Sequence, residues 1–259
     1  SLIPSPTVTY TSDNATGSLS YTPLPNANGT AAITVTVADD GGTAYGGANS
    51  TTKTFTVTVT AVNDAPVINA ISDPSAILED AGLQTINLTG IDDGDVLESQ
   101  DITVTATSSN TNLIPDPTDV YSSDDATGSL TYTPVPDANG SAVITVTVKD
   151  NGNTNNGGVN TTTTTFTVAV TAVNDPVTLS GPIDDYTVLE DDGVTTVADL
   201  DDIFDDIDLT NGDPSALQTL SYSVVGNTNP DLASASIDAA GVLTVSYTTD
   251  DNGSADITV

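Results

Sequence analysis

Apolar and polar residues alternate along much of this chain with a period of two. In one run, Ile144, Val146 and Val148 share one parity and Thr145 and Thr147 share the other. Successive side chains of a β-strand point to opposite faces of the sheet, so this pattern predicts a half-buried strand. No segment has convincing apolar spacing at 3.6 residues, and β-branched residues on both faces disfavour helix. The chain is therefore expected to be all-β.

Several such strands, separated by turn signals, are expected within one stretch of about 110 residues. Asn139-Gly140 and Asn151-Gly152 both offer the positive φ that tight connections need. Seven short strands at this spacing indicate an antiparallel β-sandwich of immunoglobulin-like architecture. The expected strands lie near residues 67–71, 85–88, 102–107, 119–121, 129–133, 143–148 and 164–173.

The sequence repeats at a fixed interval of 111 residues, which is the size of a domain. Asn63-Asp64, for example, returns as Asn174-Asp175. Units of about 100 to 150 residues can enclose a core of their own, whereas solenoid repeats are far shorter. The expected organisation is a linear array of tandem modules. Residues 1–64 form the C-terminal part of one module, residues 65–175 a complete module, and residues 176–259 most of a third, divergent module that lacks its last strands.

Both ends of the sequence fall inside a module, which leaves two hypotheses. Either the polypeptide continues through both ends, or consecutive chains complete each other's sandwiches and build a filament. Leu2 corresponds to Leu113 and Val259 to Val146, so both partial modules carry the equivalent of residues 113–146. This overlap favours a longer polypeptide.

The charge of the chain makes cations its natural partners. Only Lys53 and Lys149 oppose 36 acidic residues, and the formal net charge is −34. Nucleic acid and anionic membrane surfaces need clustered basic residues, so neither is expected as a partner, nor is direct membrane insertion. With no cysteine and no histidine, thiolate and imidazole sites and the Ser-His-Asp arrangement are excluded. The composition predicts that the chain is not an enzyme.

Carboxylates recur at corresponding places in successive modules. Leu78-Glu79-Asp80 returns as Leu189-Glu190-Asp191, an aspartate-rich loop follows the second strand, and Asn-Asp ends the last strand. If these loops converge where two modules meet, the negative charge calls for a hard cation, and calcium suits mixed oxygen ligands. Solvated turn residues are the alternative interpretation, since Asp and Asn are favoured in turns without any metal. The candidate ligands are Asp39, Asp40, Asn63, Asp64, Glu79, Asp80, Asp92, Asp93, Asp95, Asp150, Asn174, Asp175, Glu190, Asp191, Asp206 and Asp208.

The linker VNDAPV at residues 62–67, followed by Leu78-Glu79-Asp80 and the aspartate-rich loop, resembles the cadherin-like tandem repeats of large bacterial calcium-dependent surface adhesins. The segment 130–148 is also similar to that family. The resemblance implies Greek-key sandwiches with calcium at the module junctions. By that resemblance, the first junction would use Asn63, Asp64, Glu79, Asp92 and Asp95, and the second Asn174, Asp175, Glu190, Asp206 and Asp208. Two features depart from the pattern of that family: Pro176 directly follows Asn174-Asp175 without an intervening Ala, and the third aspartate loop is longer.

The expected function is an extracellular structural spacer at the cell surface, part of a large adhesin or surface filament. Its expected partners are calcium ions, the neighbouring modules of the same chain, and like chains if it forms a filament. A module that binds carbohydrate or protein is the alternative, although the aromatic content of 4% is low for a sugar site. A glycosidase with an Asp/Glu pair is the remaining enzyme class, and tandem copies of the acidic clusters argue against it.

Overall fold

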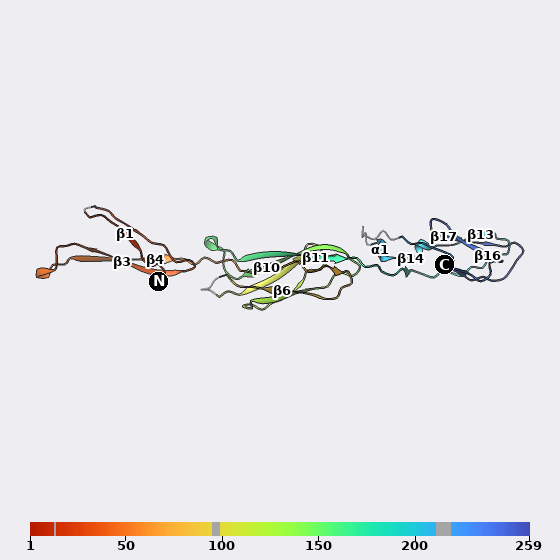
Figure 1. Cartoon of the computed structure of the whole chain (residues 1–259), viewed down its shortest axis with the longest axis horizontal. Coiled ribbons are helices and arrows are strands. Elements are labelled where there is room, and N and C mark those ends of the chain that lie inside the picture. The colour runs from red at the N-terminus through yellow and green to blue at the C-terminus, as the bar shows by residue number, and fades with distance from the viewer. Residues whose placement is uncertain (13, 95–98, 211–218) are drawn as a thin grey trace.

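The computed structural model describes residues 1–12, 14–94, 99–210 and 219–259, and its three parts follow one another along a single long axis (Figure 1). The N-terminal part contains β1 (Thr7–Thr9), β2 (Ser18–Ser20), β3 (Gly29–Ala38), the 3-10 turn η1 (Ala44–Gly46) and β4 (Ser50–Val59). The central part contains β5 (Ile77–Leu78), β6 (Gln84–Thr89), β7 (Ile102–Ser108), β8 (Thr118–Val120), β9 (Thr127–Tyr132), β10 (Gly140–Asp150), η2 (Asn155–Gly157) and β11 (Thr161–Thr171). The C-terminal part contains β12 (Thr178–Leu179), β13 (Val194–Asp199), η3 (Leu200–Asp202), β14 (Phe204–Asp205), α1 (Ile207–Thr210), β15 (Gly226–Asn227), β16 (Ala233–Ile237), β17 (Val242–Tyr247) and β18 (Ile257–Thr258).

The central part is a two-layer β-sandwich, as the alternating pattern predicts. One sheet has the strand order β5-β11-β10-β7 and the other has the order β6-β9-β8. The chain crosses between the sheets after β5, β6, β7 and β9, which is the Greek-key arrangement of immunoglobulin-like sandwiches. Every pair is antiparallel except β5 and β11, which run parallel. The fold class predicted from the sequence is confirmed.

The core of the central part lies between these two sheets. Leu88 and Leu130 from one sheet meet Ile144, Val146 and Phe166 from the other, and each is at most 2% exposed. The threonines of opposite parity face outward and are half-buried or exposed. A shift of one residue would move the apolar side chains of β10 and β11 from the core to the outer face, so their burial fixes the register of the two strands.

The first expected strand, residues 67–71, differs from the prediction. Val67 forms only an isolated bridge with Asp92, and the backbone N–H of Asn69 donates to the carbonyl of Thr89. The chain then crosses to the other sheet and pairs there as β5. Pro74 lies at this crossing and cannot donate a ladder hydrogen bond, so a single continuous strand is interrupted.

The N-terminal part has the strands that correspond to β8–β11, arranged as two hairpins, β1-β2 and β3-β4. Phe55 of β4 is 40% exposed, whereas Phe166, its equivalent in the central part, is 2% exposed. In the central part, Leu88 of β6 and Val104 of β7 lie in the same core as Phe166, and the described residues of the N-terminal part include no counterpart of these two strands.

The C-terminal part repeats the early strands of the sandwich. Its β12-β14 pair joins Thr178 to Asp205, at the place where Val67 meets Asp92 in the central part. This match aligns Asp205 with Asp92 and Asp206 with Asp93, and the order of the sequence then aligns Asp208 with Asp95. Within the described ranges, no helix is long and apolar enough to cross a membrane.

Candidate metal centre

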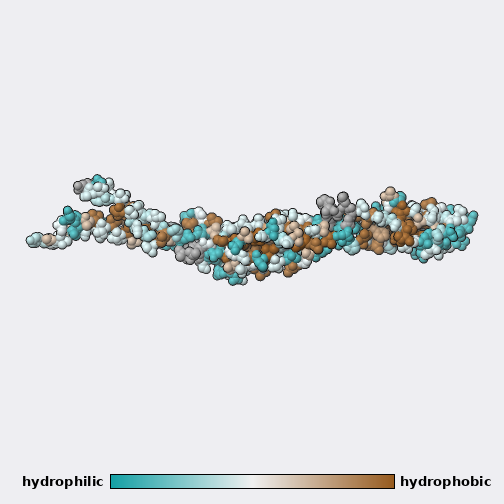
Figure 2. Space-filling model, in the orientation of Figure 1, coloured by the Kyte–Doolittle hydropathy of each residue, from teal (hydrophilic) through white to brown (hydrophobic). Residues whose placement is uncertain are grey.

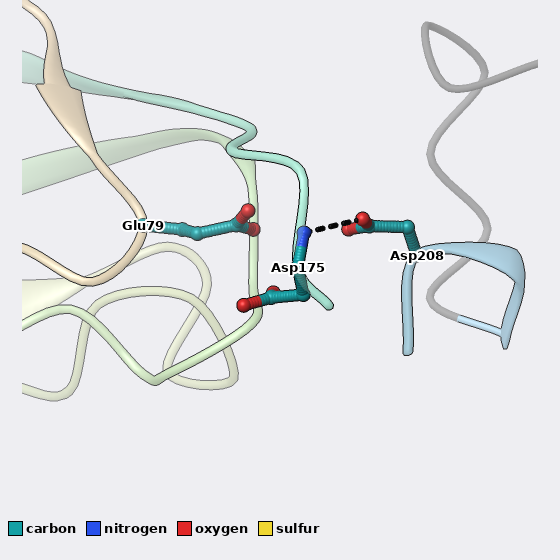
Figure 3. A group of neighbouring side chains, drawn as sticks. All are labelled: Glu79, Asp175 and Asp208. Atoms are coloured by element: carbon teal, nitrogen blue, oxygen red, sulfur yellow. Dashed lines mark hydrogen bonds between the residues drawn. The ribbon is translucent and has the colours of Figure 1, made fainter. Parts of the chain in front are cut away.

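Three carboxylates from three separate segments meet where the central part joins the C-terminal part. Glu79 follows β5, Asp175 lies in the linker after β11, and Asp208 lies in α1. Each offers one oxygen atom, and these oxygens all lie within 4.8 Å of one another. Figure 3 shows Glu79 pointing from the central part toward Asp175, with Asp208 approaching from the opposite side.

The parallel pairing of β5 with β11 brings Glu79 to this junction. Leu78 is the partner of Thr171, and the N–H of Glu79 donates to the Thr171 carbonyl over 3.1 Å. Glu79 is 1% exposed as a residue, and its Oε1 accepts a hydrogen bond from the N–H of Val173. Glu79 is thus anchored to the start of the linker before any ion binds.

Asp208 holds the linker from the C-terminal part. Its Oδ2 accepts a 2.8 Å hydrogen bond from the N–H of Asp175 (Figure 3), and the side chain is 5% exposed. The N–H of Asp208 in turn donates to Oδ1 of Asp206 over 3.0 Å, and Asp206 is also buried. Asp206 therefore holds the backbone of Asp208, and the Asp208 carboxylate contacts the linker.

A second group of carboxylates shares Asp175. Asp80, Asp137 and Asp175 also offer oxygens that lie within 4.8 Å of one another. Asp137 sits in a turn with φ of 56°, just before β10. The junction therefore joins two oxygen-rich clusters through one linker residue.

Both lysines lie away from these clusters. Lys149 pairs with Thr161, at the opposite end of β11 from the linker, and Lys53 belongs to β4 in the N-terminal part. Among the described residues, Oδ2 of Asp175 is a buried side-chain oxygen without a hydrogen-bond partner, although the residue as a whole is only half-buried. Uncompensated oxygens in a setting without basic residues suit a hard divalent cation.

The pKa of Asp175 is raised above its ordinary value, first by desolvation and then by Asp80, Asp137, Asp208 and Glu79. An acid whose folded-state pKa is raised binds more protons folded than unfolded, so stability falls as pH rises through that pKa. In chelator, we expect the melting temperature to fall with rising pH above the ordinary aspartate range. Calorimetric scans between pH 4 and 8 measure this slope, and Asp175→Asn should reduce it. An equal slope in both proteins would contradict the assignment to Asp175.

The structure corrects the expected junction of Glu79 and Asp80. The sequence placed Glu79 at the first junction, with Asn63 and Asp64, but it lies at the second, with Asp175. The β5 segment runs parallel to β11, so its end lies at the exit of the module and not at its entrance. Glu190 and Asp191 also lie away from the junction at which the sequence placed them. They precede β13, and β13 runs from their end of the module toward the segment that carries Asp206 and Asp208.

The prediction that Asp39, Asp40 and Asp150 lie at the exit of the last strand is also wrong. In the antiparallel β3-β4 pair, Ala38 is opposite Ser50 and Gly29 is opposite Val59. Asp39 and Asp40 therefore lie at the far end of the hairpin from Asn63. Asp150 likewise ends β10 at the entrance of the central part, where it contacts Asn63.

At the first junction, Asp92 and Asp93 accept hydrogen bonds from the backbone of their own module. Asp92 Oδ1 accepts from the N–H of Gly94 over 2.8 Å, and Asp93 Oδ2 accepts from the N–H of Gln100 over 2.9 Å. Within the described part of the chain, no three carboxylates meet there as they do at the second junction. Asp95 lies outside the described residues.

Glu190 does not belong to the carboxylate cluster of the second junction, and Asn174 precedes Asp175 in the linker. Asn174 is exposed, and its side-chain amide donates to the Asp175 carbonyl over 3.0 Å. Glu190 is exposed as well. Sequence reasoning did not select Asp137 as a ligand, although its place before an Asn-Gly turn recurs near Asp250 in the next module.

Comparison with known proteins gives only distant structural likenesses. No family model and no curated protein matches the chain. Domains 4 and 5 of the S-layer protein SbsC are 22% identical, with coverage of 47% of this chain and 62% of that one and a TM-score of 0.24. Domains 1–6 of the same surface layer protein are 19% identical, with coverage of 90% and 26% and a TM-score of 0.27. Zebrafish RET cadherin-like domains 1 to 4 are 13% identical, with coverage of 78% and 47% and a TM-score of 0.24. Likenesses this weak carry no functional argument.

Proposed function

We propose that this chain is an extracellular structural spacer, in which calcium at a module junction stiffens a row of β-sandwiches. The observation that carries the proposal is the convergence of Glu79, Asp175 and Asp208 from two modules and their linker. An ion held by all three would couple the exit of one sandwich to the entrance of the next. The elongated arrangement in Figure 1 is the shape that such a spacer needs.

Calcium fits this donor set better than magnesium does. Calcium takes six to eight oxygens in flexible geometry, whereas magnesium demands a near-ideal octahedron and keeps several waters. The second cluster of Asp80 and Asp137 supplies further oxygens beside the first. The proposal places the chain at the cell surface, where the extracellular calcium concentration would fill sites of the modest affinity typical of extracellular modules.

The proposal gives the chain no catalytic role. The junction carboxylates accept hydrogen bonds from the backbone N–H groups of Val173 and Asp175 and so hold the linker. The chain also has neither histidine nor cysteine for nucleophilic or imidazole chemistry. As part of an adhesin or surface filament, the spacer would hold its neighbouring modules at a fixed distance and orientation.

Calcium is expected to bind chelator-stripped protein with a dissociation constant of about 10⁻⁴ to 10⁻³ M. Isothermal titration calorimetry at moderate ionic strength measures the affinity, and small-angle scattering on the same samples measures the shape. We expect a longer, narrower distribution of particle lengths in calcium than in chelator, because the ion fixes the linker. Magnesium at the same concentration serves as the control for ionic strength and divalent charge. No heat and no change in shape up to several millimolar calcium would contradict the proposal.

A further inference from the structure

The linker residue Asn63 is buried inside the central part, although its position between two modules suggests an exposed residue. Asn63 is 7% exposed, and its neighbours Asp150 and Gln100 are 2% and 8% exposed. All three come from segments far apart in sequence, since Gln100 precedes β7 and Asp150 ends β10. A polar side chain at this depth must have its hydrogen-bonding groups satisfied.

Every polar atom of the Asn63 side chain has a partner. Its Nδ2 donates to the carboxylate of Asp150 over 3.2 Å and to the carbonyl of Val159, while Gln100 Nε2 donates to its Oδ1 over 2.6 Å. The main chain adds a bond, because the N–H of Val159 donates to the Asn63 carbonyl over 3.0 Å. A carboxylate and a carbonyl only accept hydrogen bonds, so the amide nitrogen must face them.

Two glycines leave room for this side chain. A Cβ atom built on Gly152 would overlap Oδ1 of Asn63 and lie 2.6 Å from Oε1 of Gln100. A Cβ atom on Gly158 would lie 3.1 Å from Cβ of Asn63. Gly152 has no positive φ, so its lack of a side chain serves the close approach of Asn63 and not a strained backbone.

We propose that Asn63 is a metal-independent latch, which fastens the linker to the entrance of the central sandwich. The latch fixes the direction of residues 63–66 from the downstream side, where Pro66 is also fully buried. Movement between the first two parts is then confined to residues 60–62, all of which are exposed. Asn63 acts as a positioning residue, and calcium would complete a junction that is already half fixed.

The chain contains a matched control for the glycine that admits the latch. Gly41 occupies the place of Gly152 one repeat earlier. The N–H of Gly152 donates to Asp150 Oδ1 over 2.8 Å, and the N–H of Gly41 makes the equivalent hydrogen bond to Asp39 Oδ1 over 2.9 Å. A Cβ atom on Gly41 would approach only the side chain of Asp39, at 3.1 Å. Gly41→Ala and Gly152→Ala therefore change the same turn, and only the second displaces Asn63.

The test uses the full chain in chelator, where calcium has no influence. Gly152→Ala is expected to lower the melting temperature of the central part by about 4 to 8 °C, the shift typical of losing one buried polar contact in a domain of this size. It should also raise the amide exchange rate of Val159 at least tenfold. Gly41→Ala should change neither quantity. Equal effects of the two substitutions would overturn the latch.

Asn63→Asp separates a latch from a metal ligand. The substitution places a second carboxylate against Asp150 and removes the amide donors, so the latch predicts a lower melting temperature in chelator and no gain in calcium affinity. A metal ligand predicts the reverse, because an added charge strengthens calcium binding. Tighter calcium binding together with an unchanged melting temperature would overturn the proposal. If the protein with Asp at this position does not fold, the comparison of Gly152→Ala with Gly41→Ala still decides it.

Discussion

Phe166→Ala is expected to lower the free energy of unfolding of the central part by about 3 to 5 kcal/mol. Phe166 of β11 is 2% exposed and packs in the main core, opposite Ile144 of β10. Its removal loses the transfer free energy of the ring and leaves a cavity that the two sheets can only partly close. Native-state hydrogen exchange resolved by peptide measures the change, because it reports on each part of the chain separately.

Phe55→Ala provides the control for this prediction. Phe55 occupies the same place one repeat earlier and has the same neighbours in sequence, yet it is 40% exposed. Its truncation should cost less than about 2 kcal/mol, because less apolar area leaves water on folding. Similar losses at both positions would contradict the burial difference between the first two parts.

The sequence predicts strands well where one parity is buried in the sandwich. The expected strands at residues 102–107 and 143–148 lie within β7 and β10, because the core enforces the alternation of Val and Ile with Thr. The prediction was wrong at residues 67–71, where a half-buried run forms only an isolated bridge and the paired strand is β5. This edge segment pairs briefly with one sheet and then with the other. Neither pairing is long enough to impose a clear alternation of apolar and polar residues on the sequence.

The sequence singled out the three carboxylates that meet at the second junction, but it did not place them all at that junction. The chemical types were recognisable, since Glu79, Asp175 and Asp208 were all singled out and meet in the structure. Their grouping depends on the direction in which each strand runs, and the period of two is the same in both directions. Because β5 pairs in parallel with β11, Glu79 lies at the second junction and not at the first, where it was expected.

The partners of Asn63 illustrate a further limit. Gln100 carries no sequence signal as a binding residue, because it follows an aspartate-rich loop and precedes an ordinary strand. Its role depends on a contact with Asn63, 37 residues earlier. Gly152 offered only a turn signal, and its second role, to admit the Asn63 side chain, is visible only in three dimensions.

Glu79→Gln is expected to weaken calcium binding at the second junction by at least about tenfold and to leave the first junction unchanged. The substitution keeps the size of the side chain and an oxygen that can accept from the N–H of Val173, so it removes charge with little change in packing. In chelator, one fewer negative charge beside Asp175 relieves repulsion, and the melting temperature should not fall. The increase in melting temperature on adding calcium should shrink.

Glu190→Gln is the matched control, because it makes the same chemical change at the equivalent position of the next module. Glu190 is exposed and lies outside the cluster of Glu79, Asp175 and Asp208, so calcium binding should remain close to that of the unsubstituted chain. Calorimetric titration of both proteins, with scattering to record the angle between modules, separates a local ligand from a general effect of net charge. If both substitutions weakened binding equally, the acidic residues would act as a diffuse counter-ion atmosphere, and the junction site would have to be abandoned.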